Sequence, residues 1–215
     1  MQYLTAPSHQ GIGKCRSAIL TSLKRLQVDY LDLYLIHWPG ASGKHPDDPQ
    51  HRVLRKESWQ EMESLYREGK LKAIGVSNYL VPHLDEMLKY CTVLPSVLQV
   101  EYHPHLVQQQ LLQYCTDHRI HVQAYSSLGA ASGCEKLLSE PILLEIARKY
   151  SKTPAQVLLR WATQHGLSVI PKTTQPKRLE ENADIFDFDL LYEDMNNLNS
   201  LDKQTHYCWD PSSIL

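Results

Sequence analysis

Side chains that could bind a ligand or move a proton stand at the ends of apolar segments of this 215-residue sequence. The first segment, Tyr30-Leu-Asp-Leu-Tyr-Leu-Ile-His-Trp-Pro-Gly40, ends in His37 and Trp38 and then in a Pro-Gly break. Such a run is typical of a strand buried on both faces of a parallel sheet, with Leu33, Leu35 and His37 on one face. Ligands bind at the carboxyl ends of such strands, although a buried histidine satisfied by a backbone group would fit the same pattern.

Four more segments end in polar or turn-forming residues in a similar way. They span residues 72–79, 96–104, 121–129 and 168–173. Helical patterns separate the five segments, and Gln2–Thr5 before them has the character of the end of a strand. This alternation predicts an α/β fold with a parallel sheet and right-handed crossovers. Five strand–helix units are about three fewer than a complete (β/α)8 barrel contains, so an open doubly wound sheet and an incomplete barrel both fit.

The connection after the first segment is unusually long. Residues 39–56 are rich in proline, glycine, histidine and charge, which predicts a loop. A helix is expected to begin at about Ser58, an N-cap candidate with Glu61 three residues later. It should end near Arg67, because Gly69 follows. Long loops at strand carboxyl ends often carry function.

The composition narrows the class of protein. Hydrophobic residues make up 42% and charged residues 21%, which is ordinary for a globular domain. The net charge of −2 and the absence of a Lys/Arg cluster argue against a nucleic-acid partner or an anionic membrane surface. Five scattered cysteines without a CxxC pattern predict free thiols in a reducing compartment. Without an apolar leader or a membrane-length run, we expect a soluble, cytoplasmic protein.

Several common signatures of catalytic and nucleotide sites are absent from the sequence. It contains no Gly-x-Gly-x-x-Gly after a strand, no Walker A sequence, no HExxH and no Gly-x-Ser-x-Gly. The pair His103 and His105 flanks Pro104 just past a predicted strand, which favours a rigid turn over a metal site. We therefore predict no metal centre.

Three segments resemble motifs of the aldo-keto reductase family: Asp32–Pro39 (DLYLIHWP), Ile74–Tyr79 (IGVSNY) and Ile170–Asn182 (IPKTTQPKRLEEN). They stand in the family's order, with Gln99 and Tyr125-Ser126 between them, and the resemblance runs over nearly the whole chain. It implies a TIM barrel that binds NADP(H) in extended form without a Rossmann fold. It also implies an oxidoreductase that reduces aldehydes or ketones to alcohols, with residues 1–215 as a single domain.

The resemblance implies a site for the nicotinamide end of the cofactor. Ser77, Asn78 and Gln99 match the residues that hydrogen-bond the carboxamide. Tyr125 matches the aromatic side chain that stacks on the nicotinamide ring, although a core tyrosine at a strand end would also explain it. Fixing the amide fixes the ring, as hydride transfer to a carbonyl carbon requires.

The resemblance also implies contacts to the rest of the cofactor. The loop around the pyrophosphate is matched by Ser126, Leu128 and Gly129. Lys172, Thr173 and Arg178 match the site of the adenosine 2′-phosphate, where a guanidinium fork and an ammonium suit a dianion and favour NADPH over NADH. Glu181 and Asn182 match the adenine contacts. Ordinary surface charge at the start of a solvated helix is the alternative explanation of the basic residues.

One catalytic residue and two pocket residues are implied as well. His37 matches the family histidine that hydrogen-bonds and polarises the carbonyl oxygen of a small substrate. Trp38 matches an aromatic wall of the substrate pocket. Trp209 belongs to a C-terminal segment that resembles the tail folded over that pocket.

The other members of the family's catalytic set are an aspartate, a tyrosine that protonates the alkoxide, and a lysine. Aligning the loop at residues 6–11 places Leu4, or a neighbour, where the lysine stands, and the aspartate and tyrosine before Met1. Tyr34 and Tyr102 do not replace the acid, because strand alternation turns both away from the ligand-facing side. The sequence therefore predicts an N-terminally truncated barrel that lacks about its first three strands.

Two functional hypotheses remain open at this stage. The chain belongs to an NADPH-dependent reductase, monomeric if complete, whose activity resides in the longer protein. Alternatively, it is a non-catalytic NADP(H)-binding pseudoenzyme or interaction subunit. Because five strands leave two open edges and lose buried contacts worth about 1.5–3 kcal/mol per side chain, we expect the chain by itself to be marginally stable.

Overall fold

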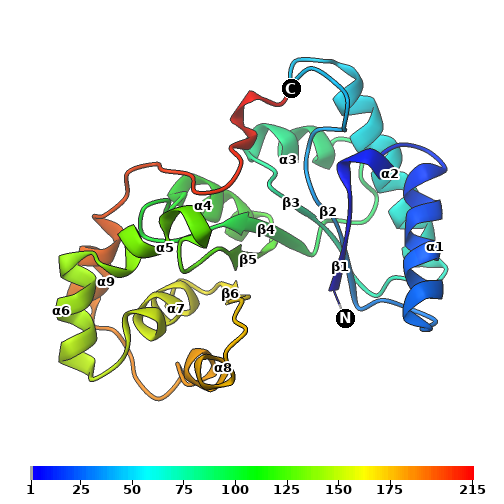
Figure 1. Cartoon of the computed structure of the whole chain (residues 1–215). Helices are drawn as coiled ribbons and strands as arrows, with labels where there is room; N and C mark the ends of the chain where they lie inside the picture. Colours follow the sequence, from blue (N-terminus) through cyan, green and yellow to red (C-terminus); the bar gives the residue numbers. More distant parts are fainter. Residues whose placement is uncertain (1) are drawn as a thin grey trace. The chain divides into compact units, whose positions relative to one another are not determined.

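The computed structural model describes residues 2–215, in which short strands alternate with helices (Figure 1). The strands are β1 (Gln2–Thr5), β2 (Leu33–Ile36), β3 (Ile74–Ser77), β4 (Val97–Glu101), β5 (His121–Tyr125) and β6 (Ser168–Val169). The α-helices are α1 (Lys14–Leu26), α2 (Gln50–Arg67), α3 (Val81–Leu88), α4 (Gln109–Asp117), α5 (Ala130–Leu138), α6 (Pro141–Tyr150), α7 (Pro154–Gln164), α8 (Pro176–Ala183) and α9 (Tyr192–Asn199). Two 3-10 helices are η1 (Pro7–His9) and η2 (Pro211–Ser213).

The strands follow one another in the sheet in the order of the sequence, from β1 to β6. β1 pairs in parallel with β2, β2 with β3, β3 with β4, and β5 with β6. The parallel α/β fold predicted from the strand–helix alternation is therefore confirmed. The described strands outnumber the five predicted units by one, because Gln2–Thr5 forms a complete strand whose every residue has a partner in β2.

The chain divides into two compact units. The first comprises the residues up to Gln99 together with residues 113–121 and 210–215, and the second comprises residues 100–112 and 122–209. The carboxyl ends of β2 and β3 lie in the first unit, and the segments that follow β5 and β6 lie in the second. The two groups of predicted ligand-binding residues are thus carried by different units.

A buried arginine organises the first unit, in which α1 packs against α2 and β1. Arg55 on α2 is completely buried, and its guanidinium binds the carboxylate of Glu86 on α3 at 2.8 Å. It also donates to the carbonyl oxygens of Pro39 at 3.1 Å and Leu215 at 2.7 Å. A buried charge left without partners would be strongly destabilising. These bonds therefore fix the segment after β2 and the last residues of the chain within one unit.

The second unit has an aromatic core. The ring of Tyr102 stacks on Trp161 of α7, with 4.6 Å between centroids, and the indole N–H of Trp161 donates to Asn199 of α9 at 2.8 Å. Thr153 caps α7. Its hydroxyl accepts from the Gln156 backbone N–H at 3.2 Å, and the Gln156 side chain accepts from the Thr153 N–H at 3.0 Å.

One predicted element boundary is wrong, the start of the helix that follows the first long loop. The predicted loop over residues 39–56 becomes helical at Gln50, and Ser58 lies inside α2 instead of capping it. The Ser58 hydroxyl donates to the Leu54 carbonyl at 2.7 Å and accepts from the Gly11 N–H at 2.8 Å, so its polar group serves a tertiary contact.

Helix α5 was not predicted, because its sequence AASGCEKLL is short and contains glycine and serine.

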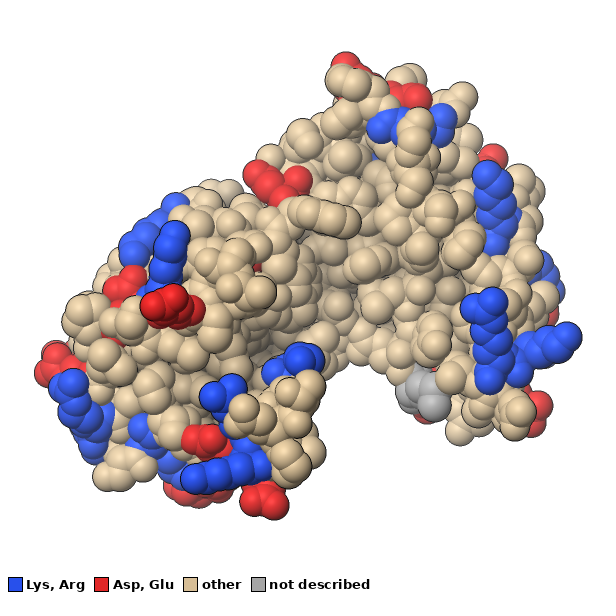
Figure 2. Space-filling view, in the orientation of Figure 1, with Lys and Arg blue, Asp and Glu red and all other residues tan. Residues whose placement is uncertain are grey.

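Acidic and basic side chains are interspersed on the face shown in Figure 2, between large uncharged areas. In the part of the chain that the structure describes, none of the helices combines the length and the apolar character needed to cross a lipid bilayer.

Candidate functional site

Asn78 joins three strand ends in the first unit. Its backbone has the left-handed conformation, with φ of 63°, which glycine and asparagine tolerate better than other residues. The Asn78 N–H donates to the Gln99 carbonyl at 2.9 Å, and its side-chain amide donates to the His37 carbonyl at 2.8 Å and to the Ser77 hydroxyl at 3.2 Å. Four predicted site residues therefore meet where the carboxyl ends of β2 and β3 lie beside Gln99, in the middle of β4.

This group around Asn78, hereafter the amide cluster, consists of Ser77, Asn78 and Gln99. Their exposed fractions are 1%, 6% and 6%. Ser77 and Gln99 are direct partners in the pairing of β3 with β4. Hydroxyl and amide groups offer both donors and acceptors, so the amide cluster has the chemistry to bind a carboxamide.

His37 follows β2 and is held through its backbone. Its N–H donates to the Thr5 carbonyl at 3.2 Å, while Gln10 fixes the next residue by donating to the Trp38 carbonyl at 2.7 Å. His37 is an exposed residue, and its imidazole has no hydrogen-bond partner among residues 2–215. It therefore does not fit the alternative of a buried, backbone-satisfied histidine. Partial burial lowers the pKa of His37, so the ring is neutral at pH 7 and has one N–H to donate.

In the second unit, a tight turn links β5 to α5. This β5–α5 turn, residues 126–130, contains Ser126, Gly129 and Ala130 with positive φ values of 52°, 90° and 51°. The Gly129 N–H donates to the Ser126 carbonyl at 2.7 Å, and the Gly133 N–H donates to the Gly129 carbonyl at 2.8 Å. A Cβ at position 129 would lie 2.7 Å from the carbonyl carbon of Gly133, so this turn requires glycine there.

The β5–α5 turn forms part of a cavity of about 550 Å³ in the second unit. Residues from the turn, from α5, from the segment after β6 and from α8 line this cavity together. The predicted cofactor residues among the lining are Ser126, Leu128, Lys172, Thr173, Arg178, Glu181 and Asn182. The structure thus brings together residues that are separated by more than forty positions in the sequence.

One wall of this cavity, hereafter the basic wall, carries Lys172 and Arg178. Lys172 and Arg178 are exposed, and neither forms an ion pair within residues 2–215. The hydroxyl of Thr173 accepts from the N–H of Gln175, the residue that precedes the first turn of α8. Two cations without carboxylate partners, next to the positive end of a helix, suit a phosphate dianion.

Tyr125 and Trp209, two aromatic residues with predicted roles in ligand binding, differ in how far they are buried. Tyr125 is partly buried, and burial, with Cys208 and Glu101 nearby, raises the pKa of its phenol, so it presents a neutral ring. Trp209 has an exposed fraction of 76% and is absent from the lining of the cavity in its unit. Its predicted role in a substrate pocket stays a prediction.

The two tyrosines excluded as acids are buried. Tyr34 donates to the Thr5 hydroxyl at 3.2 Å, and burial raises its pKa to about 12. Tyr102 lies in the aromatic core of the second unit, and burial raises its pKa as well. Neither phenol gives up its proton readily at neutral pH.

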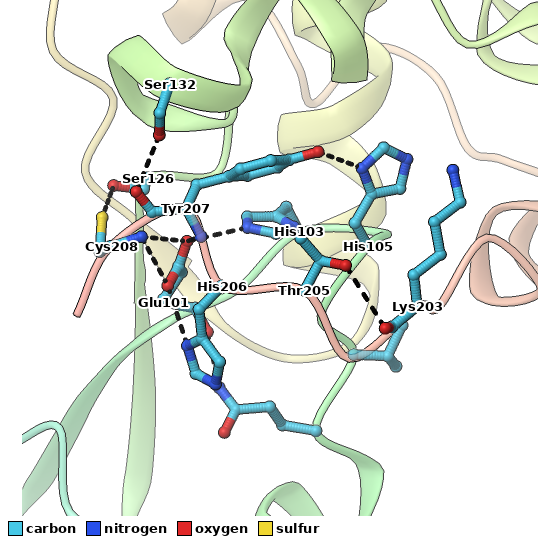
Figure 3. Close-up of polar contacts among 12 residues, drawn as sticks. Glu101, His103, His105, Ser126, Ser132, Lys203, Thr205, His206, Tyr207 and Cys208 are labelled. Carbon is cyan, nitrogen blue, oxygen red and sulfur yellow. Dashed lines mark hydrogen bonds and ion pairs between the residues drawn. The ribbon is translucent and has the colours of Figure 1, made fainter. Parts of the chain in front are cut away.

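One buried polar group was missed by the sequence reasoning. Glu101 at the end of β4 accepts from His103 at 3.1 Å and from the backbone N–H of Tyr207 at 2.7 Å (Figure 3). His103 and His105 stand in a turn, as predicted, closed by the bond from the Leu106 N–H to the His103 carbonyl at 2.8 Å. No group of three or more metal-ligating side chains within residues 2–215 is arranged to hold a metal ion. The available signal was the two-residue spacing of Glu101 and His103, which would place both on one face of the predicted strand over residues 96–104.

Comparisons with known proteins agree on one family. A family model described as "Aldo/keto reductase family" matches residues 5–203. A glyoxal reductase of Bacillus subtilis (strain 168) is 45% identical over 206 residues, which cover 96% of this chain and 69% of that protein. An aldo-keto reductase from a Medee basin deep-sea metagenome library has a TM-score of 0.88 at 37% identity, with coverage of 95% and 71%. A Bombyx mori aldo-keto reductase in complex with NADP has a TM-score of 0.86 at 30% identity, with coverage of 96% and 69%.

Proposed function

Because the chain belongs to the aldo/keto reductase family, we propose that it serves the NADPH-dependent reduction of small aldehydes or ketones to alcohols. Members of this family use NADP(H), as solved structures with NADPH and NADP illustrate. The observation that carries the proposal is the cavity of the second unit, in which Lys172 and Arg178 face a volume of about 550 Å³ without carboxylate partners.

The residues that line this cavity fit the phosphorylated end of the cofactor. We assign Lys172, Thr173 and Arg178 to the 2′-phosphate, because a forked guanidinium and an ammonium bind a dianion with charge-assisted hydrogen bonds. The β5–α5 turn is assigned to the pyrophosphate, and Glu181 and Asn182 to the adenine. A bulkier residue at position 129 would clash with the Gly133 backbone, so the conformation of this turn depends on glycine there.

The amide cluster of the first unit fits the other end of the cofactor. We assign Ser77, Asn78 and Gln99 to the carboxamide, which orients the nicotinamide ring. The chemistry that NADPH supplies when bound is a hydride. The ring of Tyr125, neutral because its pKa is raised, is suited to stack on a flat aromatic partner.

His37 is assigned to the substrate carbonyl. A neutral imidazole donates its N–H to the carbonyl oxygen, and this bond stabilises negative charge as it develops there. The bond from the Asn78 side chain to the His37 carbonyl couples this histidine to the amide cluster. Tyr34 and Tyr102 do not protonate the product oxygen, because both are buried and have raised pKa values. The steps assigned to this chain are therefore cofactor binding, ring orientation and carbonyl polarisation.

Two measurements on the 215-residue chain test the proposal. The first is a titration with NADPH, which should quench tryptophan fluorescence in a saturable way. The second is an assay of NADPH consumption, in which glyoxal is the first carbonyl to add because one relative is a glyoxal reductase. Consumption of NADPH that His37→Ala abolishes would establish the reductase. Saturable binding without consumption would leave the cofactor site intact and favour the non-catalytic alternative. A lack of saturable binding by a folded chain would contradict the proposal.

A further inference from the structure

Glu101 holds a segment near the end of the chain. We call residues 205–208 the C-terminal clamp. The Glu101 carboxylate, 2% exposed, accepts from the backbone N–H groups of Tyr207 at 2.7 Å and Cys208 at 3.2 Å, and from the His206 ring at 3.1 Å. Burial alone would raise the pKa of Glu101, but the bonds from His103, Tyr207 and Cys208 outweigh it and leave this pKa below its ordinary value. A buried carboxylate with this many donors is a strong anchor.

The C-terminal clamp in turn contacts the β5–α5 turn and the first residues of α5 (Figure 3). The Cys208 thiol lies 3.4 Å from the Ser126 hydroxyl, at the first residue of the turn. The Ser132 hydroxyl donates to the Tyr207 carbonyl at 2.8 Å. The Tyr207 ring lies against Gly133 so closely that a Cβ there would be 2.3 Å from it.

The clamp is also fixed from its other side. His105 bridges two partners, with its Nδ1 2.6 Å from the Tyr207 hydroxyl and its Nε2 2.7 Å from the Glu140 carboxylate. Lys203 completes this arrangement through a 2.8 Å ion pair with Glu140. The Tyr207 ring is therefore held at its hydroxyl and at its backbone, so it acts as a fixed surface for α5.

The β5–α5 turn requires such a support. Ser126 and Ala130 adopt positive φ values that cost energy in residues with a side chain, and Gly129 tolerates no Cβ. A strained turn persists only where its surroundings over-determine it. Ser126, Ser127 and Leu128 line the cavity of the second unit, so the support reaches a ligand-binding surface directly.

We propose that Glu101 is a positioning residue for the cofactor, because it anchors the C-terminal clamp that holds the β5–α5 turn in its ligand-binding conformation. The inference rests on the proposed function and extends it to a buried side chain outside the cavity. The two walls of the cavity should then respond differently. The clamp supports the wall made by the turn and α5, whereas Lys172 and Arg178 belong to the segment after β6 and to α8.

Two ligands distinguish the contributions of the two cavity walls to binding. NADPH requires the turn for its pyrophosphate, whereas adenosine 2′-monophosphate has no pyrophosphate and carries only the 2′-phosphate and the adenine, which are assigned to the segment after β6 and to α8. Glu101→Gln removes the negative charge and replaces one of the two acceptor oxygens, whereas the Cys208 N–H lies 3.2 Å from both oxygens in Glu101, so the bonds that hold the clamp lose their charge assistance. We expect calorimetry to show a rise of about tenfold in Kd for NADPH and no more than about a twofold change for adenosine 2′-monophosphate.

A milder pair of variants serves if Glu101→Gln does not fold. Ser132→Ala removes one clamp bond from an exposed serine and should raise Kd for NADPH about threefold. Ser139→Ala is the matched control, because this exposed serine at the other end of α5 bonds only to its own helix, at the Lys136 carbonyl. It should leave both Kd values unchanged.

The outcomes are distinguishable. An unchanged Kd for NADPH in a folded clamp variant would overturn the positioning role, as would an equal rise for both ligands. Failure of the unaltered chain to bind either ligand would instead overturn the proposed function on which this inference rests.

Discussion

The amide cluster and the basic wall of the cavity, in different units of the chain, are built in opposite ways. Ser77, Asn78 and Gln99 are at most 6% exposed, and backbone bonds between strand ends hold them. Lys172 and Arg178 are exposed and have no ion pairs within the described residues. Under the proposed function, the first group would select a ligand by a fixed pattern of donors and acceptors, and the second by charge. Rigidity and charge are thus supplied by separate parts of the molecule.

The largest expected effect concerns the turn that borders the basic wall. Gly129→Ala adds a Cβ at 2.7 Å from backbone atoms and forces a positive φ on alanine, so we expect the free energy of unfolding to fall by about 3 kcal/mol. Gly166→Ala is the matched control, because Gly166 has φ of 84° in open space. It should cost only about 1 kcal/mol. Urea denaturation measures both, and equal losses would show that backbone conformation alone requires Gly129.

The next effect tests the rigidity of the amide cluster. Asn78→Ala removes the bonds to His37 and Ser77 and keeps the strained φ, so we expect about 2 kcal/mol of lost stability. Asn78→Gly relieves the strain and should lose about half as much. Both variants should weaken NADPH binding and leave adenosine 2′-monophosphate binding unchanged. Weaker binding of the second ligand would show that the two groups do not act separately.

The smallest expected effect is a pH dependence of stability that arises in the first unit. Burial lowers the pKa of His83, whose Nδ1 accepts from the Leu80 N–H at 3.1 Å while its Nε2 faces the Ile214 carbonyl at 2.9 Å. A protonated ring would point an N–H at another N–H. The unfolded chain binds this proton more readily, so stability should fall as the pH drops below about 6.5.

The urea midpoint measured between pH 7 and pH 5.5 checks this sign. His83→Gln, which cannot titrate, should weaken the pH dependence of the midpoint only in part, because His37, His105 and His165 also have lowered pKa values. A midpoint that rises toward acid pH would contradict the assignment.

Much of the candidate site was predictable because it depends on local pattern. The apolar run before His37 and the polar ends of 72–79 and 121–129 placed their side chains at strand carboxyl ends, where the structure has them. The first turns of α2 and all of α5 were not predictable in this way. The latter is stabilised by contacts such as Gly133 against Tyr207, which join positions distant in the sequence.

The anchoring role of Glu101 was hidden for the same reason. A carboxylate at the end of a strand carries no sign that its donors come from backbone N–H groups more than a hundred residues later. The sequence also could not predict that Lys172 and Arg178 lack ion-pair partners within the described residues, since nearby Glu180 and Glu181 offered plausible partners.

The ratio of the dissociation constants for NADH and NADPH tests the central claim, that this chain binds NADP(H) through the basic wall of its cavity. Calorimetric titration of the 215-residue chain should show NADPH binding at least about tenfold more tightly than NADH, because charge-assisted bonds to the 2′-phosphate contribute about 1.5–3 kcal/mol. Arg178→Ala should reduce this preference by about tenfold and leave NADH binding unchanged. Equal affinity for the two cofactors, or a folded chain that binds neither, would contradict the account.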